Sequence, residues 1–271
     1  MMTMAEPTDI AISTENLTRV FGSLVAVHSL NLMVPSGTIF GLLGPNGAGK
    51  STTIKMLTTM LPPTSGNAVV AGHSILGDAV GVRRSMGYVS QMLSADGALT
   101  GWENLLLFAR MYGIPRRERH TRIEDALKFM GLSEFGSHLV NSYSGGMIRR
   151  LEIAQSMLHR PAVMFLDEPT IGLDPVARRL VWEKLRELRA SFGTTILMTT
   201  HDMEEAEELF DRIAIMNAGK IAVTGTPDEL KEKAGTDSMD AVFIHFAGDM
   251  SDKTATYSDI AQTRRTASRM G

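Results

Sequence analysis

Apolar residues recur along the chain in short runs that are bounded by glycine, proline or polar residues. Leu30, Leu32 and Val34 lie at alternate positions, which predicts a strand with one buried face. Most of the other runs are separated by segments with helical periodicity, and this order is typical of an α/β domain with a largely parallel sheet. These other runs occupy residues 38–43, 68–71, 86–89, 162–166, 195–198 and 212–216.

Helical periodicity dominates residues 92–160. Thr100 and Glu103 have the spacing of a capping box, so a helix is expected to begin directly after Thr100. A second helix is expected from about Arg122, and a third over residues 147–159. We therefore interpret residues 92–160 as a helical subdomain inserted into the α/β domain.

A hairpin is predicted near the C-terminal end of the apolar pattern. Within residues 213–225, Ile213 and Ile215 precede the sequence Asn-Ala-Gly, and Ile221 and Val223 follow it. A short turn of this composition favours two antiparallel strands, so we expect the first pair to face the second.

The last part of the chain differs in composition from what precedes it. Residues 9–235 are expected to form the main domain and residues 236–249 an appendage, in which 240–246 fit either a strand or a short docked helix. Residues 250–271 are polar and rich in small side chains, so we expect them to be mobile.

Composition narrows the classes of protein. A hydrophobic content of 44% over 271 residues is ample for a continuous core. A net charge of −3 gives no broad basic surface, which argues against a nucleic-acid partner. The absence of cysteine excludes disulfides and thiolate metal sites and fits a reducing compartment. No run of apolar residues is long enough to span a membrane and no export leader is evident, so neither is expected.

The sequence GPNGAGKST at 44–52 fits the phosphate-loop pattern G-x-x-x-x-G-K followed by Ser or Thr. A strand is expected before it, and after it a helix from Lys50 to about Met60. Backbone amides of such a loop surround a phosphate, while Lys50 offers a cation to the β- and γ-phosphates and Ser51 offers a hydroxyl to Mg²⁺. The candidate nucleotide-binding residues here are Gly44, Pro45, Asn46, Gly47, Ala48, Gly49, Lys50, Ser51 and Thr52.

Such a loop occurs in GTPases, kinases and ATPases alike. The chain contains no Asn-Lys-x-Asp segment of the kind that reads guanine, which counts against a GTPase. Phe21, upstream of the loop, is either an ordinary core aromatic or a side chain that stacks on a base.

Three strand ends carry candidate catalytic residues. Asp167 is placed to hold Mg²⁺ through its water shell, and Glu168 to orient and polarise the attacking water. His201 follows another apolar run and could contact the γ-phosphate, and Gln91 could reach either the metal or the water. Taken alone, an acidic pair at a strand end is usually a solvated turn and a histidine there is more often structural. Beside a phosphate loop, however, these residues favour nucleotide chemistry, with Ser51, Gln91 and Asp167 as candidate metal ligands.

A second glycine-containing turn, Ser144-Gly145-Gly146, comes directly before a helical run. The unpaired amides at such a helix start can bind an anion. Ser-Gly-Gly is also a common loop composition that means little by itself. The turn has no lysine or carboxylate of its own, so it makes sense if it completes the site of another copy. In a twofold dimer, each chain would give its phosphate loop to one nucleotide and this turn to the other.

Six motifs in one order resemble the nucleotide-binding subunit of ATP-binding cassette (ABC) transporters: GPNGAGKST, YVSQ, YSGGM, VMFLDEP, GLDP and TTHD. The resemblance covers residues 9–235. It implies a P-loop NTPase fold of the α/β class, with a mostly parallel sheet, an N-terminal antiparallel β subdomain and a helical insertion. It also implies that the chain hydrolyses ATP with Mg²⁺ and works as a homodimer.

The resemblance also implies roles for single residues. Phe21 would stack on the base, Gln91 would sense the γ-phosphate for a membrane partner, and Glu168 would be the catalytic base. Asp174 would belong to the loop that crosses the dimer, and His201 would be the γ-phosphate switch. Since Asp174 is followed by proline, it also suits the N-cap of a helix.

The Ser-Gly-Gly element departs from the commonest family sequence, Leu-Ser-Gly-Gly-Gln, because Tyr143 and Met147 flank it here. This version is similar to the daunorubicin-resistance-type branch, whose ATPase and membrane halves are separate chains. The resemblance thus implies a separately encoded membrane permease, a peripheral position on the cytoplasmic face of the plasma membrane, and export of a hydrophobic drug, lipid or glycan. A soluble ATP-driven clamp and a small-molecule kinase are the alternatives that fit less well.

Residues 92–105 are the candidate groove for a helix of that permease. Trp102 could line the groove or belong to the core of the helical subdomain, and the sequence leaves both open.

Overall fold

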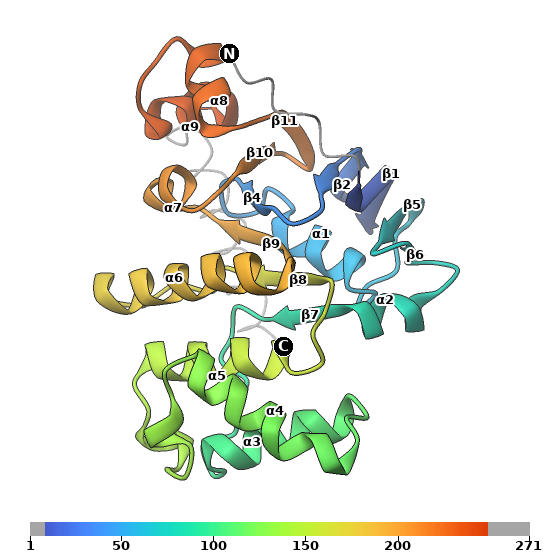
Figure 1. Cartoon of the computed structure of the whole chain (residues 1–271). Coiled ribbons are helices and arrows are strands. Elements are labelled where there is room, and N and C mark those ends of the chain that lie inside the picture. The colour runs from blue at the N-terminus through green and yellow to red at the C-terminus, as the bar shows by residue number, and fades with distance from the viewer. Residues whose placement is uncertain (1–8, 249–271) are drawn as a thin grey trace, which may run out of the picture.

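Two β-sheets and a group of helices make up the described residues, 9–248, of the computed structural model (Figure 1). The larger sheet has six strands in the order β11-β10-β4-β9-β8-β7. All its neighbours pair in parallel except β10 and β11, which confirms the mostly parallel sheet. Its strands are β4 (Ile39–Leu43), β7 (Met86–Val89), β8 (Val163–Asp167), β9 (Thr195–Thr200), β10 (Arg212–Asn217) and β11 (Lys220–Gly225).

The second sheet is the expected N-terminal antiparallel subdomain, with the order β2-β1-β5-β6 and β3 paired to β1. Leu30, Leu32 and Val34 are buried as their alternation predicts, but they do not share one strand: Leu30 ends β2, Val34 lies in β3, and Leu32 lies between the two strands. The buried hydroxyl of Thr14 separates the strands, because it donates to the Leu30 carbonyl and accepts from the Leu32 amide. The strands are β1 (Ile10–Phe21), β2 (Leu24–Leu30), β3 (Met33–Pro35), β5 (Ser65–Val70) and β6 (His73–Ser74).

The central strands of the six-stranded sheet, β4, β8 and β9, are buried on both faces. Along β4, Ile39 and Leu43 belong to a core shared with the helices of the insertion and of the C-terminal part. Phe40 and Leu42 point the other way, into a core shared with the antiparallel sheet, α1 and α2. The helices outside the insertion are α1 (Lys50–Leu57), α2 (Ala79–Ser85), α6 (Pro175–Phe192), α7 (Met203–Glu208), α8 (Pro227–Ala234) and α9 (Met239–Ala247).

The helical insertion is present, and α3, α4 and α5 lie together at the end of the molecule opposite α8 and α9 (Figure 1). The capping box predicted from Thr100 and Glu103 is formed at the start of α3. The expected start of α4 near Arg122 is wrong, because the helix begins at Arg116 directly after Pro115. The elements are α3 (Gly101–Met111), α4 (Arg116–Phe129), α5 (Gly145–Met157) and the short 3₁₀ helices η1 (Ser133–Phe135) and η2 (Val140–Ser142).

Two other helix boundaries differ from the sequence prediction. Helix α1 ends at Leu57 instead of continuing to Met60, because Thr59 adopts a left-handed backbone conformation with φ of 61°. Helix α5 begins at Gly145 rather than at residue 147, since Ser144 caps the helix and glycine leaves no periodic signal there.

The C-terminal hairpin forms around Ala218 and Gly219, which both have positive φ. Ile215 faces Val223 as predicted. The other two members of the pairs do not face each other: Ile213 faces Gly225, and Ile221 faces Met216 because the register shifts between Ile215 and Met216.

The segment 240–246, which fitted either a strand or a helix, is helical and lies within α9. Residues 250–271, expected to be mobile, lie outside the described residues. None of the helices within residues 9–248 has both the length and the apolar character that a membrane span requires.

Candidate functional site

The phosphate loop lies between the fully buried strand β4 and helix α1, as its pattern predicts. Gly49 has a φ of 105°, and a Cβ there would lie 2.5 Å from the Ala26 carbonyl oxygen of β2. Only glycine therefore lets the loop turn so close to β2. The Lys50 ammonium folds back over the loop and donates to the carbonyl oxygens of Gly44 (2.7 Å) and Pro45 (3.3 Å).

Lys50 also lies near the predicted catalytic carboxylate. Its Nζ is 3.6 Å from Glu168 Oε1, and both side chains are almost fully buried. Burial lowers the pKa of Lys50, while the negative charges of Glu168 and Asp167 oppose that shift. The carboxylates thus partly offset the cost of burying the ammonium, and a phosphate group entering the loop offers it a second source of negative charge.

Asp167 ends β8 beside the first turn of α1. The Ser51 hydroxyl donates to Asp167 Oδ1 at 3.0 Å, and the Thr199 hydroxyl donates to the same oxygen at 2.6 Å. A hydroxyl and a carboxylate are oxygen ligands of the kind that Mg²⁺ prefers, and Mg²⁺ commonly takes its remaining ligands from water and phosphate. Ser51 and Asp167 therefore fit the predicted metal site.

Side chains that follow the ends of β7, β8 and β9 meet at Glu168. Gln91 Nε2 donates to Glu168 Oε2 at 3.3 Å, and His201 Nδ1 lies 3.4 Å from Glu168 Oε1. The backbone of Glu168 is left-handed, with a φ of 48°, and its amide donates to the Thr199 hydroxyl at 2.9 Å. Such backbone conformations cost energy and are found at functional sites. Glu168 and His201 also line an open cleft of about 170 Å³.

Phe21 is not a core residue, because 43% of its surface is exposed. It ends β1 opposite Leu24 of β2, the strand that touches the phosphate loop at Gly49. The Arg19 guanidinium lies over the Phe21 ring, 4.5 Å from its centroid. An exposed ring at this edge is compatible with base stacking and contradicts the core alternative.

The Ser-Gly-Gly turn begins α5, and the Ser144 hydroxyl accepts a 3.3 Å hydrogen bond from the Met147 amide. A Cβ on Gly146 would lie 2.7 Å from Ala177 Cβ, so glycine allows the start of α5 to pack against the start of α6. Asp174 caps α6 as expected, because its carboxylate accepts from the Val176 and Ala177 amides. The turn and Asp174 therefore lie side by side.

The hydrogen bonds and ion pairs within residues 9–248 do not join this turn to the phosphate loop or to Glu168. The structure thus brings the predicted residues into two groups. The first group contains Lys50, Ser51, Gln91, Asp167, Glu168 and His201. The second group contains Ser144, Gly145, Gly146 and Asp174.

Residues that support the first group were not predicted. The buried carboxylate of Glu205 accepts hydrogen bonds from the Thr170 hydroxyl and, at 2.9 Å, from Trp182 Nε1. Burial raises the pKa of Glu205. These contacts hold the loop after Glu168 against α7. In the sequence Glu205 is one of four glutamates in a short acidic helix, so no local signal distinguishes it from a solvated residue.

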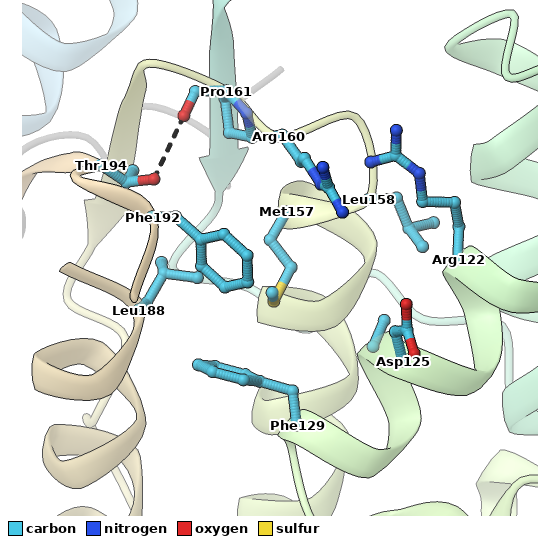
Figure 2. Close-up of a pocket in the computed structure, with 11 residues that line it drawn as sticks. Arg122, Asp125, Phe129, Met157, Leu158, Arg160, Pro161, Leu188, Phe192 and Thr194 are labelled. Atoms are coloured by element: carbon cyan, nitrogen blue, oxygen red, sulfur yellow. Dashed lines mark hydrogen bonds between the residues drawn. The ribbon is translucent and has the colours of Figure 1, made fainter. Parts of the chain in front are cut away.

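A separate pocket of about 200 Å³ opens between α4, the end of α5 and the end of α6 (Figure 2). Phe129 and Phe192 stand across it with ring centroids 5.7 Å apart, and Arg122 and Arg160 lie at its rim. It contains none of the predicted site residues. Because the Ser144 turn begins α5, and α5 is about 20 Å long, this pocket lies at the far end of that helix.

The chain is similar in sequence to known proteins. A family model described as "ABC transporter" matches residues 27–171. The daunorubicin resistance ATP-binding protein DrrA3 of Streptomyces coeruleorubidus is 42% identical over 234 residues, which cover 86% of this chain and 74% of that protein. The daunorubicin/doxorubicin resistance ATP-binding protein DrrA of Streptomyces peucetius is 44% identical over 84% of this chain and 69% of its own length.

A solved structure is similar as well. The protein cbiO1 of Clostridium perfringens, described as part of the ABC transporter complex cbiONQ, superposes with a TM-score of 0.77 at 27% identity. The match covers 83% of this chain and 92% of that one. The two-sheet arrangement and the helical insertion are thus those of a known ATP-binding subunit fold.

Proposed function

Since this chain belongs to the ABC transporter ATPase family, we propose that it is the ATP-hydrolysing subunit of a drug exporter, and that two copies dimerise on ATP to drive export through a separate membrane subunit. The observation that carries the proposal is the meeting of Lys50, Gln91 and His201 around Glu168. Each comes from a different segment, yet all four side chains meet beside the phosphate loop.

In the proposed reaction, the loop amides and Lys50 bind the phosphates of ATP, and Ser51 and Asp167 hold Mg²⁺. Bound Mg²⁺ would neutralise charge on the phosphate oxygens. When ATP is bound, the Lys50 ammonium pairs with the γ-phosphate instead of with Glu168. The Glu168 carboxylate is then free to accept a proton from the attacking water. Gln91 and His201, both within 3.4 Å of Glu168, are placed to orient that water and the γ-phosphate.

Dimerisation is inferred from the second group of residues. The Ser144 turn has free amides but no cation, and its neighbours expose apolar side chains. Such side chains favour contact with another protein surface. The exposed ones near the turn are Leu139, Ile171, Val176 and Leu180. A second copy related by a twofold axis would cover them and bring each Ser144 turn to the other chain's phosphate loop.

The membrane subunit is inferred from a second exposed apolar surface. Met92 and Leu93, next to Gln91, are 81% and 51% exposed, and Leu107 and Met111 are exposed on α3. Trp102, by contrast, is half-buried against the core of the helical subdomain and lies 4.9 Å from the His120 ring. We therefore assign Met92 and Leu93 rather than Trp102 to the contact with the permease, and place the chain on the cytoplasmic face of the membrane. Drugs such as those named for the relatives are the proposed cargo.

Dilution of the purified chain tests the dimer-dependent reaction. With saturating Mg²⁺ and ATP, the rate per chain should fall as dilution converts dimers to monomers. Light scattering at each dilution reports the fraction of dimer. If the rate per chain stays constant even where only monomer remains, dimer-dependent hydrolysis is wrong.

Co-expression with a membrane protein encoded in the neighbouring reading frame tests whether the chain binds a membrane subunit. The variant Met92→Asp should lose co-purification, whereas Met60→Asp, at an exposed methionine that follows α1, should retain it. Recovery of ribosomes or DNA would favour a soluble clamp instead, and a phosphorylated metabolite would favour a kinase.

A further inference from the structure

A buried ion pair on α5 lies beside the loop that carries Gln91. Arg149 Nη1 and Glu152 Oε2 are 2.9 Å apart, and each side chain is only 2% exposed. The predicted chemistry uses neither residue. Burial of two charges costs desolvation free energy unless both are paired and hydrogen-bonded. The other hydrogen bonds of Arg149 and Glu152 therefore indicate the role of the pair.

Those contacts all go to one short segment. Arg149 Nη1 donates to the Ser90 carbonyl at 2.7 Å, and Nη2 donates to the Gln91 carbonyl at 2.9 Å. The Glu152 carboxylate accepts from both the amide and the hydroxyl of Ser94. The loop from Ser90 to Ser94 is therefore attached to α5 at both of its ends, and Gln91 lies inside the attached segment.

Stability alone does not account for the pair. Replacing a buried ion pair with apolar side chains is often neutral or stabilising in proteins. Arg149 Nε is also buried without a hydrogen-bond partner among the described residues, which adds a cost. Burial lowers the pKa of Arg149, and the negative charge of Glu152 opposes that shift. What the charges do achieve is a fixed position for the backbone on both sides of Gln91.

We propose that Arg149 and Glu152 are positioning residues that hold Gln91 at a fixed place relative to α5, so that Gln91 and the Ser144 turn move as one body. This inference rests on the proposed function and deepens it. Ser144 begins the helix that carries Arg149, about 7 to 8 Å away along its axis. Gln91 belongs to one nucleotide site, and Ser144 serves the nucleotide of the partner copy. The ion pair thus links the two sites of the dimer through α5.

The variant Arg149→Lys tests the role, because lysine keeps the charge but lacks the rigid two-donor fork. We expect kcat for ATP hydrolysis to fall about 10-fold while KM for ATP stays within about 2-fold, since the phosphate loop is on another segment. The matched control is Arg150→Lys on the same helix. Arg150 also donates to a backbone carbonyl, that of Met130 at 2.8 Å, but does not touch the Gln91 loop. Both its kcat and its KM should stay within about 2-fold of the parent values.

The double variant Arg149→Met with Glu152→Leu separates positioning from stability. Its melting temperature should stay close to that of the parent, since an apolar pair can fill the same space. Its kcat should nevertheless remain as low as that of Arg149→Lys. If the double variant recovers the parent kcat, or if Arg149→Lys never loses it, the proposal is wrong.

Hydrogen exchange gives a readout that does not depend on activity. The Ser94 amide donates to Glu152, so it should exchange at least about 10-fold faster in the double variant Arg149→Met with Glu152→Leu, which has no acceptor there, than in Arg150→Lys. Equal exchange in the two variants would overturn the attachment of the loop. Absence of ATP hydrolysis in the parent chain would instead contradict the proposed function, and the exchange rates would still decide whether the pair holds the loop.

Discussion

The helix that begins at Lys50 and the helix that begins at Gly145 both follow small residues, yet the two starts are built differently. At α1 the capping residue is Gly49, which has no side chain, so the first amides of the helix are left for a ligand. At α5 the Ser144 hydroxyl already accepts from the Met147 amide. The amides at the start of α1 are therefore open to a phosphate, whereas one amide at the start of α5 is already hydrogen-bonded within its own chain.

The surroundings of the two starts differ even more. Around α1 lie a lysine, a hydroxyl and two carboxylates, which together can hold a nucleotide and a metal. Around α5 lie Gly146, packed against Ala177, and the capping carboxylate of Asp174. A helix start that follows small residues can thus form a complete site or only part of one, depending on the side chains around it.

Removal of the carboxylate beside α1 should have the largest effect. Glu168→Gln keeps the shape of the side chain but cannot accept a proton, so we expect kcat for ATP hydrolysis to fall about 10³-fold. ATP binding and ATP-dependent dimerisation should remain, because they depend on other groups. Glu183→Gln, on the exposed side of α6, is the control. Hydrolysis at the parent rate in Glu168→Gln would refute the catalytic assignment.

Removal of the cation should have the next largest effect. Lys50→Ala deletes a buried ammonium whose contacts with phosphate are charge-assisted, so ATP affinity should fall about 100-fold. The matched control is Lys55→Ala, an exposed lysine on the same helix. Equilibrium binding of a fluorescent ATP analogue measures both. Equal affinity in the two variants would mean that α1 does not form the primary site.

The parts of this site that the sequence predicts are those with local signals. The phosphate loop has a fixed spacing, and Asp167, His201 and Gln91 each follow an apolar run. Since the carboxyl ends of parallel strands meet at one edge of a sheet, these residues could be expected to converge before the fold was seen. The structure confirms that convergence around Glu168.

The parts that the sequence does not predict depend on contacts between distant segments. Arg149 and Glu152 resemble ordinary charged residues of an amphipathic helix, and only the position of the 90–94 loop shows that they are buried. The start of α4 lacks a sequence signal for a related reason. Its first turn is charged and exposed, so hydrophobic periodicity becomes visible only later, near Ile123.

Mixing two inactive variants tests whether the two helix starts act in different chains. Ser144→Arg should block hydrolysis because the long side chain fills the space meant for the partner's nucleotide, and Lys50→Ala should block it through binding. A mixed dimer, however, has one site with an intact lysine and an intact serine. With random pairing and independent sites, an equal mixture should recover about a quarter of the parent rate.

The control for mixing is each variant alone at the same total concentration. A mixture no faster than the sum of the separate variants would place Lys50 and Ser144 in the same chain's site, or show that Ser144 has no part in it. Either outcome would remove the difference between the two helix starts as an argument for a dimer.

The smallest effect is expected from the aromatic residue beside the first helix start. Phe21→Ala removes an exposed ring that we propose stacks on the base, and loss of about 1 kcal/mol of stacking should raise KM for ATP about 5-fold. The value of kcat should change little, because Phe21 is far from the attacking water in the proposed reaction. Leu24→Ala, its cross-strand partner in the same hairpin, is the control for changes in the hairpin itself.

Nucleotide specificity sharpens the Phe21 test, because stacking depends on the base and the phosphate loop does not. Phe21→Ala should weaken ATP binding while leaving inorganic triphosphate binding unchanged, whereas Lys50→Ala should weaken both. If Phe21→Ala lowers the affinity for triphosphate as much as for ATP, the ring supports the loop rather than the base. The site at the start of α1 would then bind only the phosphates of ATP, and a residue other than Phe21 would have to contact the base.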